Sequence, residues 1–141
     1  MIGAKQLYHS MAKVSQRYSK LKGLFDQFCN LANSHLTSEQ CQVKGIVFNP
    51  DLESNRFCVT FVGTSIVFFF TFSQDEQACV TCSKVSPMPE GSETTIGSFS
   101  FNGQADTNLR TPEEEDVLGI DTEASAGFLV LHFLNEALQK K

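Results

Sequence analysis

A pair of cysteines three residues apart is the pattern in this sequence most suggestive of chemistry. Cys79-Val80-Thr81-Cys82 is a CxxC. Redox pairs of this kind lie at a helix N-terminus, and zinc-binding pairs lie in a tight turn with a second pair of ligands elsewhere. Here the surrounding residues predict a β-strand, in which residues three apart point to opposite faces. No second CxxC or HxxxH follows, so we expect core or surface thiols and no metal site.

The three histidines lie in segments with a helical pattern. His132 precedes Glu136 by one helical turn, a surface pair that needs no function. A Cys–His dyad for nucleophilic catalysis would meet in space rather than in sequence, so the sequence leaves it open. Because no P-loop, GxGxxG, GxSxG or HExxH pattern occurs, we expect a protein that is not an enzyme and that uses no cofactor.

Four consecutive carboxylates, Glu113, Glu114, Glu115 and Asp116, are the densest charge in the chain. Calcium loops space their ligands at alternate positions with a glycine at the bend, which this run does not do. The preceding Thr111-Pro112 instead indicates the start of a short helix with a capping box, which Gly119 would end. The alternative is an acidic edge that faces a protein partner, so all four are candidate partner-binding residues.

The composition is that of a folded domain, with 41% hydrophobic residues among 141, thirteen Phe and no Trp. The five cysteines are an odd number, and the first residues lack the apolar region of a signal peptide. We therefore expect free thiols and a cytoplasmic location. The longest uncharged run, residues 57–74, contains Gly63-Thr64-Ser65 in its middle. This punctuation favours a buried hairpin over a membrane span.

The net charge of −5 is unevenly distributed. Residues 1–36 carry five Lys or Arg and one Asp, which sums to +4 and leaves −9 for the remainder. An acidic body disfavours nucleic-acid binding, because phosphate contacts need neutralising Lys or Arg. It suits a basic protein partner, or the basic first helix of the chain itself.

The first segment has the clearest periodicity. Eight apolar residues spaced 4-3-4-3-4-3-4 predict one stripe of a helix: Leu7, Met11, Val14, Tyr18, Leu21, Phe25, Phe28 and Ala32. Lys13, Arg17 and Lys20 line one flank of this stripe. An unbroken helix over residues 4–34 is roughly 45 Å long, whereas a strand of eight residues spans roughly 26 Å. The Leu7–Val14 end should therefore extend past the sheet, unless a break at Gly23 folds both halves onto the body.

The middle of the chain predicts an antiparallel meander. Strand patterns occupy residues 43–48, 56–62, 65–73, 78–85 and 94–101, with a possible return at 104–107. Asn49-Pro50-Asp51 indicates a loop and Asn102-Gly103 a hairpin turn. A two-residue turn at Gly63-Thr64 would pair Val59 with Phe68 and Phe57 with Phe70, all facing the core. The run 66–72 is apolar on both sides, so we expect a central strand covered on both faces.

Asp121 or Thr122 is the expected cap of a last helix that continues to about Lys140. Its predicted buried stripe consists of Ala124, Phe128, Leu131, Leu134 and Leu138.

The sequence thus predicts one α+β domain over residues 1–141. It comprises a long N-terminal amphipathic helix (1–36), an antiparallel sheet of five to six strands (43–108), and an acidic short helix plus a C-terminal helix packed on the sheet (112–140). The favoured function is a non-enzymatic interaction protein, an adaptor or an inhibitor of the immunity-protein kind, which binds a protein partner and forms a homodimer through its first helix. The predicted partner-binding residues are Leu7, Met11, Val14, Lys13, Arg17, Lys20 and the four carboxylates at 113–116. The alternative is a small-ligand binder with a Phe-lined apolar pocket between helix and sheet, and an enzyme ranks third.

Overall fold

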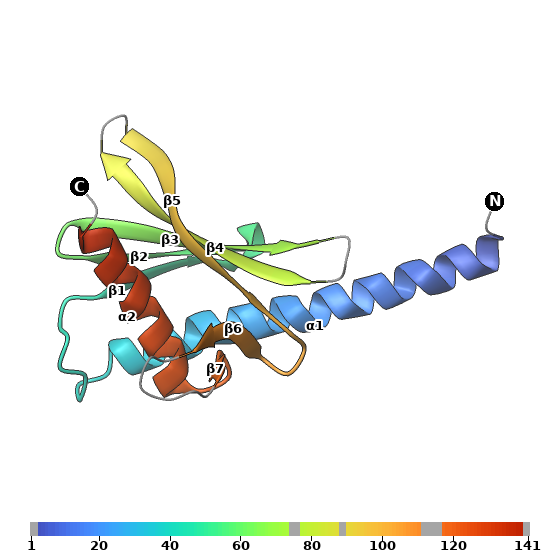
Figure 1. Ribbon diagram of the computed structural model, residues 1–141, viewed down its shortest axis with the longest axis horizontal. Coiled ribbons are helices and arrows are strands. Elements are labelled where there is room, and N and C mark those ends of the chain that lie inside the picture. Colours follow the sequence, from blue (N-terminus) through green and yellow to red (C-terminus); the bar gives the residue numbers. More distant parts are fainter. Residues whose placement is uncertain (1–2, 74–76, 88–89, 111–116, 140–141) are drawn as a thin grey trace.

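The computed structural model describes residues 3–73, 77–87, 90–110 and 117–139. Within them the chain forms a long helix, an antiparallel sheet and a second helix (Figure 1). The elements are α1 (Ala4–Leu36), β1 (Val47–Asp51), a single 3-10 turn (Leu52–Ser54), β2 (Arg56–Phe61), β3 (Thr64–Phe72), β4 (Ala78–Pro87), β5 (Glu90–Phe101), β6 (Asp106–Arg110), β7 (Val117–Gly119) and α2 (Glu123–Gln139). This is the predicted α+β arrangement, but the described sheet has seven strands instead of five to six.

The additional strand is β7. Each strand pairs with the next along the chain, in the order β1 to β7, which makes the sheet a meander. The prediction of a helical turn ending at Gly119 was wrong, because Val117–Gly119 pairs with β6 instead. This pairing is tied to the core: the Thr107 hydroxyl donates to the Leu118 carbonyl at 2.6 Å, and Leu118 and Ile120 are buried. The predicted helix start at 111–116 lies outside the described residues.

The first strand begins later than predicted. The sequence indicated a strand over 43–48 and a loop at Asn49-Pro50-Asp51, but β1 runs from Val47 to Asp51 and contains Pro50. Because β1 is the edge of the sheet, the missing N–H of Pro50 can face away from the ladder, the position in which strands tolerate proline.

The β2–β3 hairpin keeps the predicted faces and changes the predicted partners. Its turn is Val62-Gly63, with φ of 51° and 76°, as a type I′ turn requires. Phe57 therefore pairs with Phe68, and Val59 with Ile66. The predicted register was wrong by two residues, and an even shift leaves every side chain on its predicted face.

One face of the sheet carries the core, and both helices cover it. The Phe68 ring of β3 is met edge-on by Phe28 of α1 at 5.9 Å and by Phe133 of α2 at 5.7 Å, and it stacks on Phe57 at 4.9 Å. Gly97 of β5 makes room for this packing, because a Cβ there would lie 2.7 Å from Cε1 of Phe133.

We predicted cover on both faces of β3, and the helices cover only one of them. On the opposite face the Phe69 side chain remains 36% exposed. The Arg56 guanidinium lies 5.5 Å from the centre of this ring and 3.8 Å from the Glu93 carboxylate.

The first helix runs unbroken through Gly23, as the continuous stripe predicted. A Cβ at Gly23 would meet no atom within 4 Å, so this glycine marks neither a break nor a close contact. Burial is confined to the C-terminal half of α1, at Leu21, Phe25, Phe28, Cys29, Ala32 and Leu36.

The second helix is capped as predicted but buries a different side. The Thr122 hydroxyl accepts from the Ser125 N–H at 3.3 Å. Of the predicted buried stripe only Leu134 is buried; the buried residues of α2 are Ala126, Gly127, Leu129, Val130, Phe133, Leu134 and Ala137. Contacts with distant residues determine which side of α2 is buried. Phe133 fits over Gly97, and His35 of α1 packs against Gly127, where a Cβ would lie 2.5 Å from the His35 Cδ2 atom.

Candidate interaction surface

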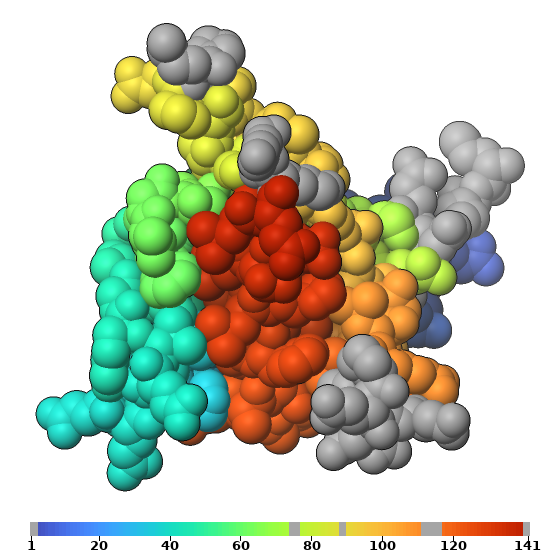
Figure 2. Space-filling model, turned by 60° about the vertical axis from the view of Figure 1, so that its left-hand side comes forward, coloured from blue at the N-terminus to red at the C-terminus, as the bar shows by residue number. Residues whose placement is uncertain are grey.

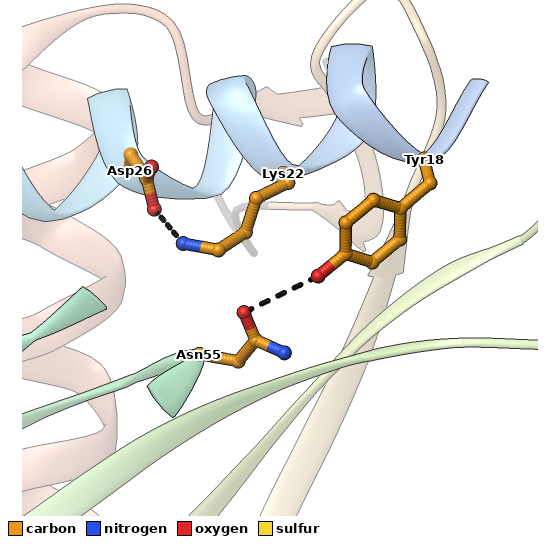
Figure 3. Close-up of polar contacts among 4 residues, drawn as sticks. All are labelled: Tyr18, Lys22, Asp26 and Asn55. Atoms are coloured by element: carbon orange, nitrogen blue, oxygen red, sulfur yellow. Dashed lines mark hydrogen bonds and ion pairs between the residues drawn. The ribbon is translucent and has the colours of Figure 1, made fainter. Parts of the chain in front are cut away.

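Tyr18 is where α1 leaves the body of the protein. Its ring lies 5.9 Å from Phe70 and 5.6 Å from Phe72, and its hydroxyl donates to the Asn55 side-chain oxygen at 3.4 Å (Figure 3). One turn further on, Lys22 forms an ion pair with Asp26 on the same helix, also drawn in Figure 3. Apolar contact with the sheet therefore begins at Tyr18 and continues toward the C-terminal end of α1.

Residues 4–17 of α1, which we call the overhang, extend past the sheet (Figure 1). Their apolar side chains lie in solvent: Leu7 is 48% exposed, Met11 54% and Tyr8 79%, while Val14 is half-buried. The overhang is about 21 Å long at about 1.5 Å per residue. The helix thus extends past the sheet at its N-terminal end, as the comparison of helix and strand lengths predicted.

The three basic residues of the predicted flank separate into two environments. Lys13 is exposed on the overhang. Arg17 and Lys20 instead lie against the turn between β5 and β6: a Cβ at Gly103 would be 2.6 Å from an Arg17 guanidinium nitrogen and 3.4 Å from the Lys20 ammonium. Lys13 is therefore the member of this flank that a partner on the overhang would meet first.

Two of the surface clefts beside α1 bear on the expectation of an apolar-ligand pocket. One, of about 650 Å³, lies between α1 and the β5–β6 hairpin and is lined mostly by polar residues, among them Arg17, Gln77, Asn102, Asp106 and Asn108. The other, of about 540 Å³, lies between α2 and the segment after α1, with Cys41, Val43, Glu123 and Leu131 among its lining residues. Neither has the ring of Phe side chains that an apolar-ligand pocket was expected to have. The Phe side chains of the core pack on one another instead.

The outer side of α2 is a second exposed apolar stripe. Phe128 is 42% exposed and Leu138 45%; Leu131, between them, is half-buried, and Ala124, one turn before Phe128, is exposed. We call Ala124, Phe128, Leu131 and Leu138 the α2 stripe. Figure 2 shows the outer side of α2, in red, at the molecular surface. Sequence reasoning missed this surface because it assigned these same residues to the core. The available signal was that α2 carries two apolar stripes and only one can face the sheet.

Three further expectations concern the acidic run, metal binding and membrane insertion. Glu113, Glu114, Glu115 and Asp116 lie outside the described residues. Among the described residues, no group of three or more His, Cys, Asp or Glu is arranged to hold a metal ion. In the same part of the chain, no helix is both long and apolar enough to cross a membrane.

The five cysteines are all described and all free. Cys82 is buried opposite Phe68, whereas Cys79 is half-buried opposite Thr71 on the other face, as expected for a CxxC in a strand. Burial raises the pKa of the Cys29 thiol to about 12, with a smaller contribution from the nearby Asp26 carboxylate. Burial also raises the pKa of Cys82.

These pKa shifts predict selective alkylation of the native protein. Thiolates are the reactive form, so iodoacetamide at neutral pH should modify Cys41, Cys58 and Cys79 well before Cys29 and Cys82. Peptide mass spectrometry over a time course measures the five rates, and the denatured protein, in which all five should react alike, is the control. Modification of Cys29 or Cys82 as fast as Cys79 in the native protein would contradict the structure.

No match was found when the chain was compared with protein-family models, with curated proteins and with solved structures.

Proposed function

We propose that this chain is a non-enzymatic protein-interaction protein and that the overhang of α1 is its docking element. The observation that carries the proposal is the exposure of Leu7, Tyr8 and Met11 on a helix that continues past its own sheet. Full burial of one large apolar side chain contributes about 1.5–3 kcal/mol. Three such side chains, each about half exposed or more, supply enough apolar surface to seat a helix on a partner.

The charge of this element bears on the kind of partner. The overhang, residues 4–17, carries Lys5, Lys13 and Arg17 and no Asp or Glu. The acidic average of the whole chain favours a basic partner, but the docking element is itself basic. A receiving surface that complements it combines an apolar centre with carboxylates at the rim.

Site-specific photo-crosslinking tests the proposal. A benzophenone side chain is placed at position 11 and, as the control, at position 16, which lies on the opposite side of the same helix. Position 11 should give protein adducts in native lysate or with the purified protein, and position 16 should not. Adding Leu7→Glu, which places a charge in the same stripe, should remove the adducts at position 11. Adducts to lipid alone, equal adducts at both positions, or none at position 11 would contradict the proposal.

A further inference from the structure

We propose that the surface receiving the overhang is the α2 stripe of a second copy of the chain. This inference rests on the proposed function, because it takes the overhang to be the docking element. Two apolar helix surfaces of the described part of the protein face solvent: the overhang, through Leu7 and Met11, and the α2 stripe, through Phe128 and Leu138. The two surfaces are complementary in the spacing of their apolar residues, in charge and in shape.

The spacing of the two stripes matches. The stripe residues of the overhang lie at 7, 11 and 14, and those of the α2 stripe at 124, 128, 131 and 138. The overhang steps by four and three residues, and the α2 stripe steps by four, three and seven, so each set stays on one side of its helix, as lengthwise packing of one helix on another requires. A 14-residue overhang and the 15 residues from Ala124 to Leu138 are also nearly equal in length.

The charges of the two surfaces are opposite. The overhang, residues 4–17, holds three basic and no acidic residues, which sums to +3. Residues 117–139 hold Asp121, Glu123 and Glu136 and no Lys or Arg, which sums to −3. Pairing the overhang with the overhang of a second copy would instead bring two basic helices together, and like charges across an interface are repulsive. The charge pattern therefore favours α1 on α2 over α1 on α1.

The shape of the receiving surface can also accommodate a side chain of the overhang. The cleft of about 540 Å³ adjoins the α2 stripe through Leu131, and Val43 and Glu123 form part of its lining. A long, flexible side chain such as Met11 can enter a cleft with mixed lining of this kind. In this arrangement Glu123 lies beside the basic residues of the overhang.

The resulting contact joins two different surfaces. The free end of α1 and the outer side of α2 lie toward opposite ends of the molecule (Figure 1). A contact between unlike surfaces is heterologous, and it closes into a ring of copies or continues as a chain. We therefore expect the mass of the particle in solution to rise with protein concentration and to fall with added salt.

Charge reversal in two variants tests the pairing. Lys5→Glu/Gln6→Glu/Lys13→Glu changes the charge of the overhang from +3 to −2, and Glu123→Lys/Glu136→Lys changes the charge of residues 117–139 from −3 to +1. Each variant alone places like charges at the contact and should be monomeric by light scattering at concentrations where the wild type associates. An equimolar mixture of the two variants should associate again, because each overhang then meets an α2 stripe of opposite charge.

Several results would overturn this pairing: a monomeric wild type at all concentrations, wild-type association by either variant alone, or a mixture that remains monomeric. If circular dichroism shows that the α2 variant folds poorly, photo-crosslinking tests the pairing instead. The benzophenone is placed at position 11 of the purified, otherwise wild-type protein. Its adducts should map by mass spectrometry to residues 124–138 of another copy, and adducts elsewhere on the chain would refute the inference. Adducts that form only with other proteins in lysate would refute the second-copy contact and leave the docking function of the overhang intact.

Discussion

Replacing Phe68 by Ala is expected to lower the free energy of unfolding by about 3–5 kcal/mol, the range measured for large aromatic side chains removed from protein cores. Phe68 is fully buried and touches the rings of Phe28, Phe57 and Phe133, which come from α1, β2 and α2. Its removal leaves a cavity where three elements meet, so the structure can collapse only partly around it. Urea denaturation followed by circular dichroism measures the change.

The neighbouring Phe69→Ala is the matched control. Phe69 lies on the face that the helices leave open, and its main described contact is the Arg56 guanidinium over its ring. A cation–π contact at an exposed site contributes about 0.5–1 kcal/mol, so this variant should lose much less stability than Phe68→Ala. A larger loss at Phe69 would show that β3 presents its other face to the core.

Met11→Glu is expected to weaken association at least tenfold, which corresponds to about 1.4 kcal/mol. The substitution replaces an apolar contact at the centre of the overhang by a carboxylate, which would meet both a desolvation cost and the acidic rim of the proposed receiving surface. Concentration-dependent light scattering or sedimentation measures the effect.

At protein concentrations where the wild type is monomeric, the same variant should leave the melting temperature unchanged, because Met11 is exposed and lies beyond the last apolar sheet contact at Tyr18. Gln16→Glu adds the same charge on the opposite side of α1 and should associate like the wild type. Loss of association in both variants would point to net charge rather than to the stripe, and a lower melting temperature in Met11→Glu would mean that the overhang folds against its own chain.

Two features of the fold follow from local patterns, and the structure agrees with both. The apolar stripe keeps its phase through Gly23, and α1 is continuous there, because a helical repeat needs only one side of the chain to be apolar. Strict alternation put Phe57, Val59, Ile66, Phe68 and Phe70 on one face, and all five are buried together. This result survived a wrong register, because the turn moved by one residue and the partners by two. The exposed overhang followed from the same level of reasoning, since the helix is longer than any strand of the sheet.

The α2 stripe and β7 were decided only by tertiary structure. α2 is apolar on two sides, so its periodicity fits either orientation, and the choice depends on how Phe133 meets Gly97 and how Gly127 meets His35. Those partners lie some 36 and 92 residues away in sequence. β7 likewise forms where a helical turn was predicted, because Leu118 and Ile120 gain burial beside Thr107 and Ala105. Periodicity states which side chains are apolar, whereas the fit between distant elements decides which of them the core accepts and which remain for a partner.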